Sequence, residues 1–364
     1  MCGRPAAGHL PLHLFPSETD MTLSVAIYGA SGYTGAELIR LLTVHPDVKI
    51  TALSAESNAG KAMADVFPQF AAYDLPRLTT IADLDLAPVD VLFCALPHGT
   101  TQTSLKAALE TRPDLKVVDL SADFRLSDPA MYQHWYGHAH QAEALQTEAV
   151  YGLTEIHREA IAGARLVGNP GCYTTTALLP LIPLVGAGVI DTDNIVVDAK
   201  SGVTGAGRAA KVATLFSEVA EGFHAYSVGN HRHTAELDQE LSLAAGVSVA
   251  PTFTPHLIPI NRAIYATIYV TGDPEAIHAT LAERYASEYF VNVLPFGEVP
   301  QSRHVRGSNF TRLGVVADRR PGRAIVISTL DNLVKGASGQ AVQNMNVMCG
   351  LDETTGLKQL ALFP

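Results

Sequence analysis

One cysteine, Cys172, lies where the sequence predicts the start of a helix. It follows a short apolar run (residues 166–168) and the tripeptide Asn-Pro-Gly, and a helical apolar pattern begins at residue 177. Unpaired amide N–H groups and the positive end of the helix dipole gather at such a position, and both favour the thiolate. Cys172 is therefore a candidate covalent nucleophile with a lowered thiol pKa. The alternative is a small buried core residue.

A nucleophilic thiol needs a group that takes up and returns a proton. Histidine does this near neutral pH because its reference pKa is about 6.5. Residues 224–233 contain three histidines and lack the apolar periodicity of a core segment. We predict that His231 is the general acid/base, with His233 as second choice, and that Glu221 and Arg232 contact the substrate. A solvated surface residue is the alternative for each histidine.

A glycine-rich segment could bind an anionic substrate. Residues 200–208 (KSGVTGAGR) end a predicted strand with a loop that contains two hydroxyls and two cations. Such loops suit phosphate or carboxylate groups, so Lys200, Ser201 and Gly202 are candidate substrate ligands. A flexible turn is the alternative.

Two further polar residues follow strands of the first half of the chain. Arg125 could clamp an oxyanion beyond the carboxyl end of its strand, or pair with Asp123 or Asp128 at the surface. Asn169, together with the amides at the predicted helix start, could stabilise a tetrahedral oxyanion next to Cys172.

The elements that must position these residues begin with a glycine turn. A strand over residues 23–28 leads into G-x-x-G-x-x-G and then a helix over 36–44, which is the context of a dinucleotide-binding turn. Further strands at 48–53, 89–96 and 116–120 alternate with a helix at 103–110, so we expect a parallel, doubly wound sheet. The candidate cofactor ligands in the turn are Gly29, Ser31, Gly32, Tyr33, Thr34 and Gly35.

The end of the second strand normally meets the adenosine ribose of a dinucleotide. Glu56 could accept a ribose hydroxyl, which would favour NAD. Ser54, Ser57 and Lys61 could instead hold a 2′-phosphate, and these hydroxyls and the cation favour NADP. A solvated polar loop is the alternative for each residue.

The second half of the chain is predicted to contain more strands and fewer helices than the first half. Strands are predicted at 194–199, 252–260, 263–270, 314–316 and 324–330, with one helix near 274–287. Residues 336–349 return to a helical pattern with Val342, Met345 and Met348 on one face. We therefore predict an α/β protein: an extension (1–20), a Rossmann-like cofactor domain (21–169 plus 335–364) and a sheet-rich α+β catalytic and oligomerisation domain (170–334).

Composition excludes several classes of protein. The 364 residues carry a formal net charge of −11 and no cluster of Lys and Arg, so we expect no nucleic-acid partner. No apolar run reaches the roughly 20 residues that cross a bilayer. The four cysteines are widely spaced, which predicts no metal site and no disulfide framework and fits a cytoplasmic protein.

Seven segments, taken in order, resemble the N-acetyl-γ-glutamyl-phosphate reductases, and the resemblance spans residues 21–364. The segments are 29–35 (GASGYTG), 96–99 (LPHG), 119–125 (DLSADFR), 151–155 (YGLTE), 169–173 (NPGCY), 200–202 (KSG) and 229–233 (GNHRH). Asn169 and Lys61 depart from the family's pattern, in which histidine and arginine are common.

The resemblance implies a fold shared with aspartate-semialdehyde dehydrogenase and NADPH-dependent reduction of an acyl phosphate in arginine biosynthesis. It implies that Cys172 is the nucleophile, that His231 is the acid/base and that Gly336 and Gln343 surround the cofactor. It also implies a homo-oligomer, a dimer or tetramer. The alternatives are a sister enzyme of lysine or aspartate metabolism, and an NADP-binding protein without catalysis.

Overall fold

The first of two sheets is built entirely from parallel strands. The computed structural model describes residues 22–363, so the extension predicted for residues 1–20 lies outside the described residues. Neighbouring strands follow the order β3-β2-β1-β4-β5-β7-β6 and all pair in parallel. Their bounds are β1 Leu23–Tyr28, β2 Val48–Ser54, β3 Leu78–Thr79, β4 Val91–Cys94, β5 Lys116–Asp119, β6 Val150–Tyr151 and β7 Leu166–Gly168. The predicted doubly wound sheet is confirmed.

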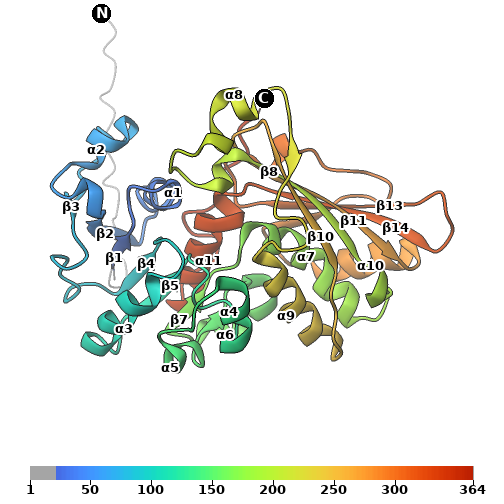
Figure 1. The fold of residues 1–364 in the computed structure, drawn as a ribbon, viewed down its shortest axis with the longest axis horizontal. Helices are drawn as coiled ribbons and strands as arrows, with labels where there is room; N and C mark the ends of the chain where they lie inside the picture. Colours follow the sequence, from blue (N-terminus) through green and yellow to red (C-terminus); the bar gives the residue numbers. More distant parts are fainter. Residues whose placement is uncertain (1–21, 364) are drawn as a thin grey trace, which may run out of the picture.

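Helices cover both faces of this sheet (Figure 1). Val25 and Ile27 of β1 pack in one core with α1, whereas Ala26 and Tyr28 pack in another with α3. Alternate residues of a strand point to opposite faces, so a central strand covered on both sides is apolar throughout. The helices are α1 Tyr33–Leu42, α2 Met63–Val66, α3 Thr101–Thr111, α4 Pro129–Tyr136, α5 Glu143–Gln146 and α6 Thr154–Ala162.

The last helix of the chain packs back onto this first sheet. A π-helical turn at Val334–Ser338 leads into α11 (Gly339–Met348). Val342, Met345 and Met348 are buried in the core that also contains Val25 and Ile27. The turn that precedes α11 thereby comes beside the glycine turn of β1, where the Ser338 hydroxyl donates to the carbonyl of Thr34 at 2.9 Å.

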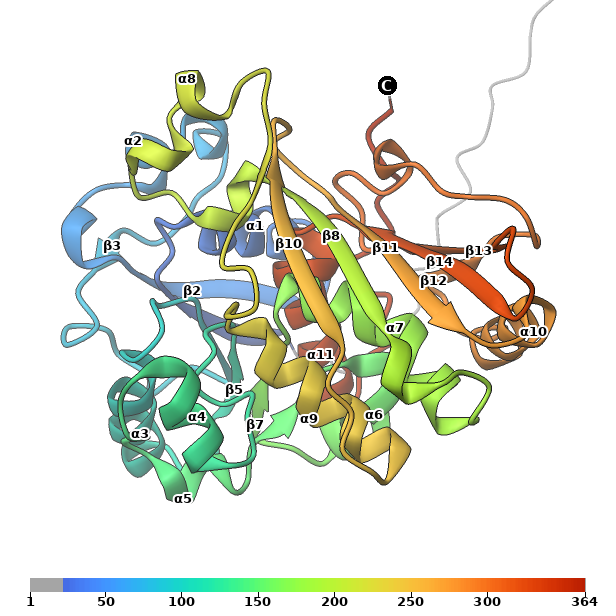
Figure 2. The same ribbon diagram turned by 45° about the vertical axis from the view of Figure 1, so that its right-hand side comes forward.

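The second sheet is mixed and follows the order β12-β13-β14-β11-β8-β10-β9. Figure 2 shows β10, β8, β11 and β14 side by side with α7 close to them. Burial alternates along β11, because one face packs on a core that includes α7 and the other stays partly exposed. The bounds are β8 Val196–Gly202, β9 His224–Ala225, β10 Thr252–Ile258, β11 Ile264–Thr271, β12 Val291–Val293, β13 Thr311–Ala317, β14 Arg323–Leu330, α7 Cys172–Gly186, α8 Phe216–Val219, α9 His233–Ala245 and α10 Pro274–Arg284.

The sequence predicts a single helix, near 274–287, in the region that follows the Cys172 helix, and this prediction is wrong. That helix exists as α10, but α9 is a second long one. The buried face of α9 carries Glu236 and Glu240 next to Leu237 and Leu241. Carboxylates on a buried face interrupt the apolar period by which a helix is recognised.

Candidate active site

Cys172 is the first residue of α7, as the sequence predicts. Gly171, the residue before it, has an extended backbone and no side chain that could cap the helix. The carboxylate of Glu236 on α9 caps this end of the helix instead: its Oε2 accepts from the Gly171 N–H and from the Thr174 hydroxyl, both at 3.0 Å. A carboxylate at this end of a helix satisfies amides that would otherwise lack partners.

The predicted lowering of the thiol pKa is wrong for the protein without ligands. Burial raises the pKa of Cys172 to about 11, although the Arg125 guanidinium and the N–H of Tyr173 act in the opposite direction. Desolvation of a thiolate outweighs the helix terminus here. The thiol is therefore protonated at neutral pH, and a proton acceptor has to activate it.

Two cavities meet at Cys172. A groove of about 720 Å³ runs from the glycine turn to Cys172, and a second cavity of about 530 Å³ continues on the far side. Both are lined by His98, Cys172, Gly205 and His233. The thiol thus lies where two ligands could meet, which is the geometry that a reaction between a cofactor and a substrate requires.

Most of the predicted cofactor ligands line the first cavity, which we call the cofactor groove. It lies at the carboxyl ends of β1 and β4, where the strand order of the sheet reverses. The predicted residues that line it are Gly29, Ser31, Gly32, Tyr33, Thr34, Ser54, Ser57 and Gly336.

Two observations fit a dinucleotide in this groove. Gly29 has φ +78°, and a β-carbon there would meet the carbonyl oxygen of Ala95 at 2.3 Å, so the turn requires glycine. The Ser54 hydroxyl is buried and has no hydrogen-bond partner among the described residues. An unpaired buried hydroxyl at the end of β2 is suited to a ribose or its phosphate.

Three predicted cofactor ligands do not line the groove. Gly35 lies beneath the turn, where a β-carbon would meet the carbonyl oxygen of Gly29 at 2.4 Å. Lys61 is exposed and donates to the Asn58 side chain at 3.1 Å. Gln343 is buried outside the groove, where its Oε1 accepts from the Lys335 ammonium at 2.7 Å. Gly336 does line the groove, since a β-carbon there would meet Cβ of Cys172 at 2.8 Å.

The second cavity, which we call the substrate cavity, contains positive charge. His231, Arg232 and Ser201 line it as predicted, and Lys211 joins them. Its described lining residues include no Asp or Glu. An anionic substrate suits such a cavity.

Three predicted substrate ligands lie outside both cavities. Lys200 is paired with Asp198 at 2.7 Å, and Gly202 packs against the Asn261 backbone, where a β-carbon would meet the carbonyl oxygen at 2.6 Å. Glu221 is exposed and has φ +61°.

The two candidate acid/base histidines are in contact. Their ring centroids are 4.7 Å apart, and Nδ1 of His231 accepts from the backbone N–H of His233 at 3.1 Å. Burial lowers the pKa of His231 to about 4 and that of His233 well below its ordinary value. His233 also packs closely against the turn before Cys172: a β-carbon at Gly171 would lie only 2.5 Å from its Nε2. Both rings are neutral at pH 7 and can accept a proton.

Arg125 is buried, so the predicted alternative of a surface pair with Asp123 or Asp128 is wrong. Its Nη1 lies 3.1 Å from the Glu236 carboxylate, and its Nε donates to the carbonyl of Asn169 at 2.7 Å. The pair joins the loop after β5 to α9 and fixes the backbone just before Cys172.

Asn169 lines the cofactor groove but its side chain is engaged. Its Nδ2 donates to the carbonyl of Ala337 and its Oδ1 accepts from Asn344, both at 3.2 Å. These bonds tie the segment before Cys172 to the C-terminal helix and its preceding turn.

Sequence reasoning missed Glu236, Lys211, Arg208 and His98 as site residues. Glu236 follows His233 at a spacing of three, which places both on one helix face, but α9 was not predicted. Arg208 lies in the recognised glycine-rich loop; its Nη1 donates to the carbonyl of Ser31 at 2.8 Å and its guanidinium lies 4.4 Å from the Phe67 ring. Lys211 follows that loop, and His98 was noted only as part of a family motif.

Within residues 22–363, no cluster of three or more His, Cys, Asp or Glu side chains is arranged to hold a metal ion. None of the helices described for these residues is long and apolar enough to span a bilayer.

Two family profiles match the chain in succession. Residues 24–164 match the profile described as "Semialdehyde dehydrogenase, NAD binding domain", and residues 172–332 match "Semialdehyde dehydrogenase, dimerisation domain". The boundary between the two profiles falls just before Cys172.

Relatives and solved structures match almost the whole chain. The N-acetyl-gamma-glutamyl-phosphate reductase of Afipia carboxidovorans is 64% identical over 344 residues, which cover 93% of this chain and 98% of that protein. The reductase of the same name from Rhodospirillum rubrum is 59% identical over 348 residues, covering 94% and 99%. The structure of aspartate semialdehyde dehydrogenase II of Vibrio cholerae has a TM-score of 0.68 at 18% identity and covers 90% of this chain and 98% of that one. The Candida albicans enzyme, solved with NADP, gives 0.66 at 17% identity with coverages of 90% and 98%. These structures share the fold.

Proposed function

This chain belongs to the N-acetyl-γ-glutamyl-phosphate reductases, and on that premise we propose that Cys172 forms a thioester with the acyl group of the substrate. The enzyme is an oxidoreductase that converts N-acetyl-γ-glutamyl phosphate to N-acetylglutamate 5-semialdehyde with NADPH, a step of arginine biosynthesis. The observation that carries the thioester proposal is that Cys172 lines both the cofactor groove and the substrate cavity.

The first step is activation of the thiol. With a pKa of about 11, only about one thiol in ten thousand is ionised at pH 7. We assign the proton transfer to the histidine pair, which lies next to the helix start and is neutral at that pH. Both histidines line the substrate cavity. His231 is the first choice for the acid/base, as the family resemblance implies, and His233, which packs against Gly171, is the second.

The thiolate sulfur then attacks the acyl carbon of the substrate. A carbon–sulfur bond forms, the bond from that carbon to the phosphate oxygen breaks, and phosphate leaves with the bonding electrons. The amides at the start of α7 stabilise the tetrahedral oxyanion, and Arg232, Ser201 and Lys211 bind the anionic groups of the substrate. Asn169 and Arg125 hold the backbone of this site.

When bound, the dinucleotide supplies the hydride that reduces the thioester to the aldehyde. The cofactor is NADP, and the residues that would hold it are the glycine turn, Ser54, Ser57 and Gly336. Arg208 also lines this groove and adds a positive charge beside Ser31.

The organisation around this site is part of the proposal. Residues 21–169 with 335–364 bind the cofactor, and residues 170–334 carry the substrate cavity and the oligomer contacts. The chain forms an oligomer through its dimerisation domain, and we propose a dimer or tetramer in the cytoplasm.

A phosphate-release burst tests the thioester. The protein is mixed with N-acetyl-γ-glutamyl phosphate in the absence of NADPH, and released phosphate and protein mass are measured together. We expect one phosphate per active site and a mass gain of one N-acetylglutamyl group. Cys172→Ser should show neither, while the matched variant Cys349→Ser should show both. Full turnover with NADPH but no mass gain at Cys172 would remove the thioester from the mechanism.

The substrate is tested in the reverse direction. Protein, NADP⁺ and phosphate are mixed with N-acetylglutamate 5-semialdehyde, with aspartate semialdehyde as the control, and NADPH absorbance is followed. We expect phosphate-dependent reduction of NADP⁺ only with the acetylated aldehyde. Equal rates with aspartate semialdehyde would contradict the substrate assignment.

A further inference from the structure

Lys335 is completely buried, and no step of the proposed reaction uses it. Its ammonium lies 2.6 Å from Oε1 of Glu155, which is also buried, and 2.7 Å from Oε1 of Gln343. The Nε2 of Gln343 donates to the same Glu155 oxygen at 2.9 Å, so the three side chains form one closed group. Glu155 lies in the first turn of α6, and Lys335 precedes α11. The ion pair therefore joins two segments that are 180 residues apart in the sequence.

Stability alone does not account for this buried pair. The attraction between two buried ions does not always recover the free energy that their removal from water costs, and apolar residues of similar volume often stabilise a protein as well. The second carboxylate oxygen of Glu155, Oε2, is buried and has no hydrogen-bond partner among the described residues. Such an unpaired oxygen adds a further cost. What the pair does provide is a fixed position for the backbone at Lys335.

Lys335 belongs to the π-helical turn Val334–Ser338. In this segment the N–H of Gly336 donates to the carbonyl of Asp331 at 2.9 Å. The bond spans five residues, whereas a bond in an α-helix spans four. Successive residues of an α-helix are rotated by about 100° around its axis. A change from the π-helical to the α-helical register would therefore turn the side chains of this segment away from their present neighbours.

The two residues that follow Lys335 face the active site. Gly336 and Ala337 both line the cofactor groove. A β-carbon at Gly336 would lie 2.8 Å from Cβ of Cys172, so the backbone of the turn packs directly against the nucleophile. The carbonyl of Ala337 accepts from the Asn169 side chain at 3.2 Å. A change of register in this turn would disrupt these contacts and alter the wall of the groove.

We propose that Lys335 is a positioning residue for the reaction with NADPH: its ammonium, held by Glu155 and Gln343, keeps the turn in the π-helical register that forms a wall of the cofactor groove. Lys335 lines neither the groove nor the substrate cavity, so it acts through the turn. No residue of the turn lines the substrate cavity, and the effect is therefore specific to the cofactor. The proposal rests on NADPH as the cofactor but not on the thioester at Cys172.

Steady-state kinetics of the variant K335M/E155Q test the proposal. Both replacements keep the side-chain length, and removing the two charges together leaves no buried carboxylate without a counter-charge. The KM for NADPH should rise by about tenfold or more, because a small displacement of a binding wall has a large effect. The KM for N-acetyl-γ-glutamyl phosphate and the midpoint of urea unfolding should stay close to those of the unmodified chain. A merely structural role would instead lower kcat with the folded fraction and leave both KM values unchanged.

R158M/E288Q is the matched control, because it removes another ion pair that joins α6 to a distant segment. Neither residue lines the groove, and no hydrogen bond described for residues 22–363 joins either of them to the turn. Both KM values should be those of the unmodified chain. Gln343→Leu keeps the ion pair and removes one acceptor of the ammonium, so the KM for NADPH should rise by about threefold. Fluorescence titration with NADPH, which needs no substrate, should give the same ratios.

Three results would overturn the proposal. The first is an unchanged KM for NADPH in K335M/E155Q and in Gln343→Leu. The second is an equal rise in the KM for the acyl phosphate, which would indicate that the whole site has loosened. The third is an equal rise in the KM for NADPH in R158M/E288Q, which would assign the effect to any loss of charge on α6. Should K335M/E155Q fail to fold, Gln343→Leu decides by the same criteria.

Discussion

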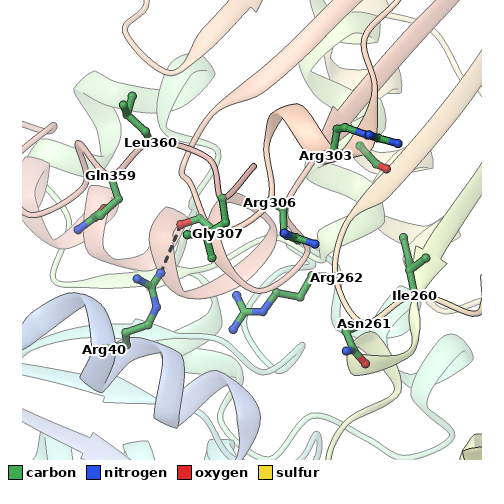
Figure 3. A pocket seen from close by; sticks show the side chains of 11 residues that line it. Arg40, Ile260, Asn261, Arg262, Arg303, Arg306, Gly307, Gln359 and Leu360 are labelled. Atoms are coloured by element: carbon green, nitrogen blue, oxygen red, sulfur yellow. Dashed lines mark hydrogen bonds between the residues drawn. The ribbon is translucent and has the colours of Figure 1, made fainter. Parts of the chain in front are cut away.

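The cofactor groove and a separate cavity lined by Arg40, Arg262, Arg303 and Arg306 (Figure 3) both contain cations, but the two sets of cations differ in burial. In the groove, the Arg125 side chain is 6% exposed and its partner Glu236 1%. Arg125 also donates to the carbonyls of Leu120 and Asn169. In the second cavity, the side chains of Arg40 and Arg262 are 41% and 27% exposed.

The difference in burial bears on stability. A buried pair whose hydrogen-bonding groups are engaged within the protein holds the backbone in place, and breaking it leaves an uncompensated charge. Arg303 is exposed, so its guanidinium remains solvated. Substitution of the buried pair should therefore affect both catalysis and folding, whereas substitution of an exposed arginine such as Arg303 should leave stability nearly unchanged.

The largest effect is expected at the thiol. Cys172→Ser should lower kcat by about four orders of magnitude or more, because a serine hydroxyl cannot form the thioester at neutral pH. NADPH binding, followed by fluorescence titration, should stay within about threefold, because the glycine turn is unchanged. Residual turnover above one per cent would assign the covalent step to another residue.

The next largest effect is expected at the histidine pair, and the pH dependence of activity distinguishes the role of His231 from that of His233. His231→Asn should lower kcat/KM by about 10²–10³-fold at pH 7. The unmodified chain should keep a flat profile above pH 6 and lose activity toward pH 4, since His231 accepts a proton only in its neutral form and its pKa is about 4. In the variant, log kcat/KM should instead rise with slope one from pH 7 to 10, because the thiol with a pKa of about 11 must then ionise unaided.

His233→Asn serves as the comparison for this profile. A flat profile in His231→Asn together with a rising one in His233→Asn would assign the acid/base role to His233. Cys172→Ser provides the baseline of activity that involves no thiol.

A folding measurement tests the contrast between the two sets of arginines directly. Glu236→Gln should lower the free energy of unfolding by about 3 kcal/mol, because Arg125 remains buried without a compensating charge. Arg303→Gln should change it by less than about 0.5 kcal/mol, as is usual for exposed positions. Urea unfolding of both variants gives the two values. Equal values would show that the buried pair has no special role in stability.

Much of this architecture could be predicted from the sequence, for physical reasons that differ by region. Strand β1 has the predicted bounds, because a continuous apolar run that is followed by glycine leaves few alternatives. Cys172 at a helix start follows from the extended Pro-Gly pair before it. Helix α9 was missed because its buried face carries Glu236 and Glu240, whose partners come from distant segments.

The same limit applies to the site. The sequence predicts which residue types can react, but the pKa of Cys172 depends on how deeply the folded chain buries it. Gln343 was assigned to the cofactor through its family segment, yet its contacts with Lys335 and Glu155 place it in a buried network. The cavity lined by four arginines is not visible in the sequence, since Arg40 and Arg262 are more than 200 residues apart and meet through Glu37.

The smallest effects are expected at two cations, Arg208 in the cofactor groove and Lys61 outside it, where the contrast between fixed and exposed charge recurs. Arg208 lines the groove and contacts the carbonyl of Ser31 in the glycine turn, so Arg208→Ala should weaken NADPH and NADH alike, by about tenfold. Lys61 is exposed and held only at Asn58, so Lys61→Ala should weaken NADPH by about two- to threefold and leave NADH unchanged. Fluorescence titration with both cofactors gives the four ratios. A loss for NADPH alone in Arg208→Ala would make Arg208 the residue that recognises the 2′-phosphate, and an equal loss for both cofactors in Lys61→Ala would exclude Lys61 from that role.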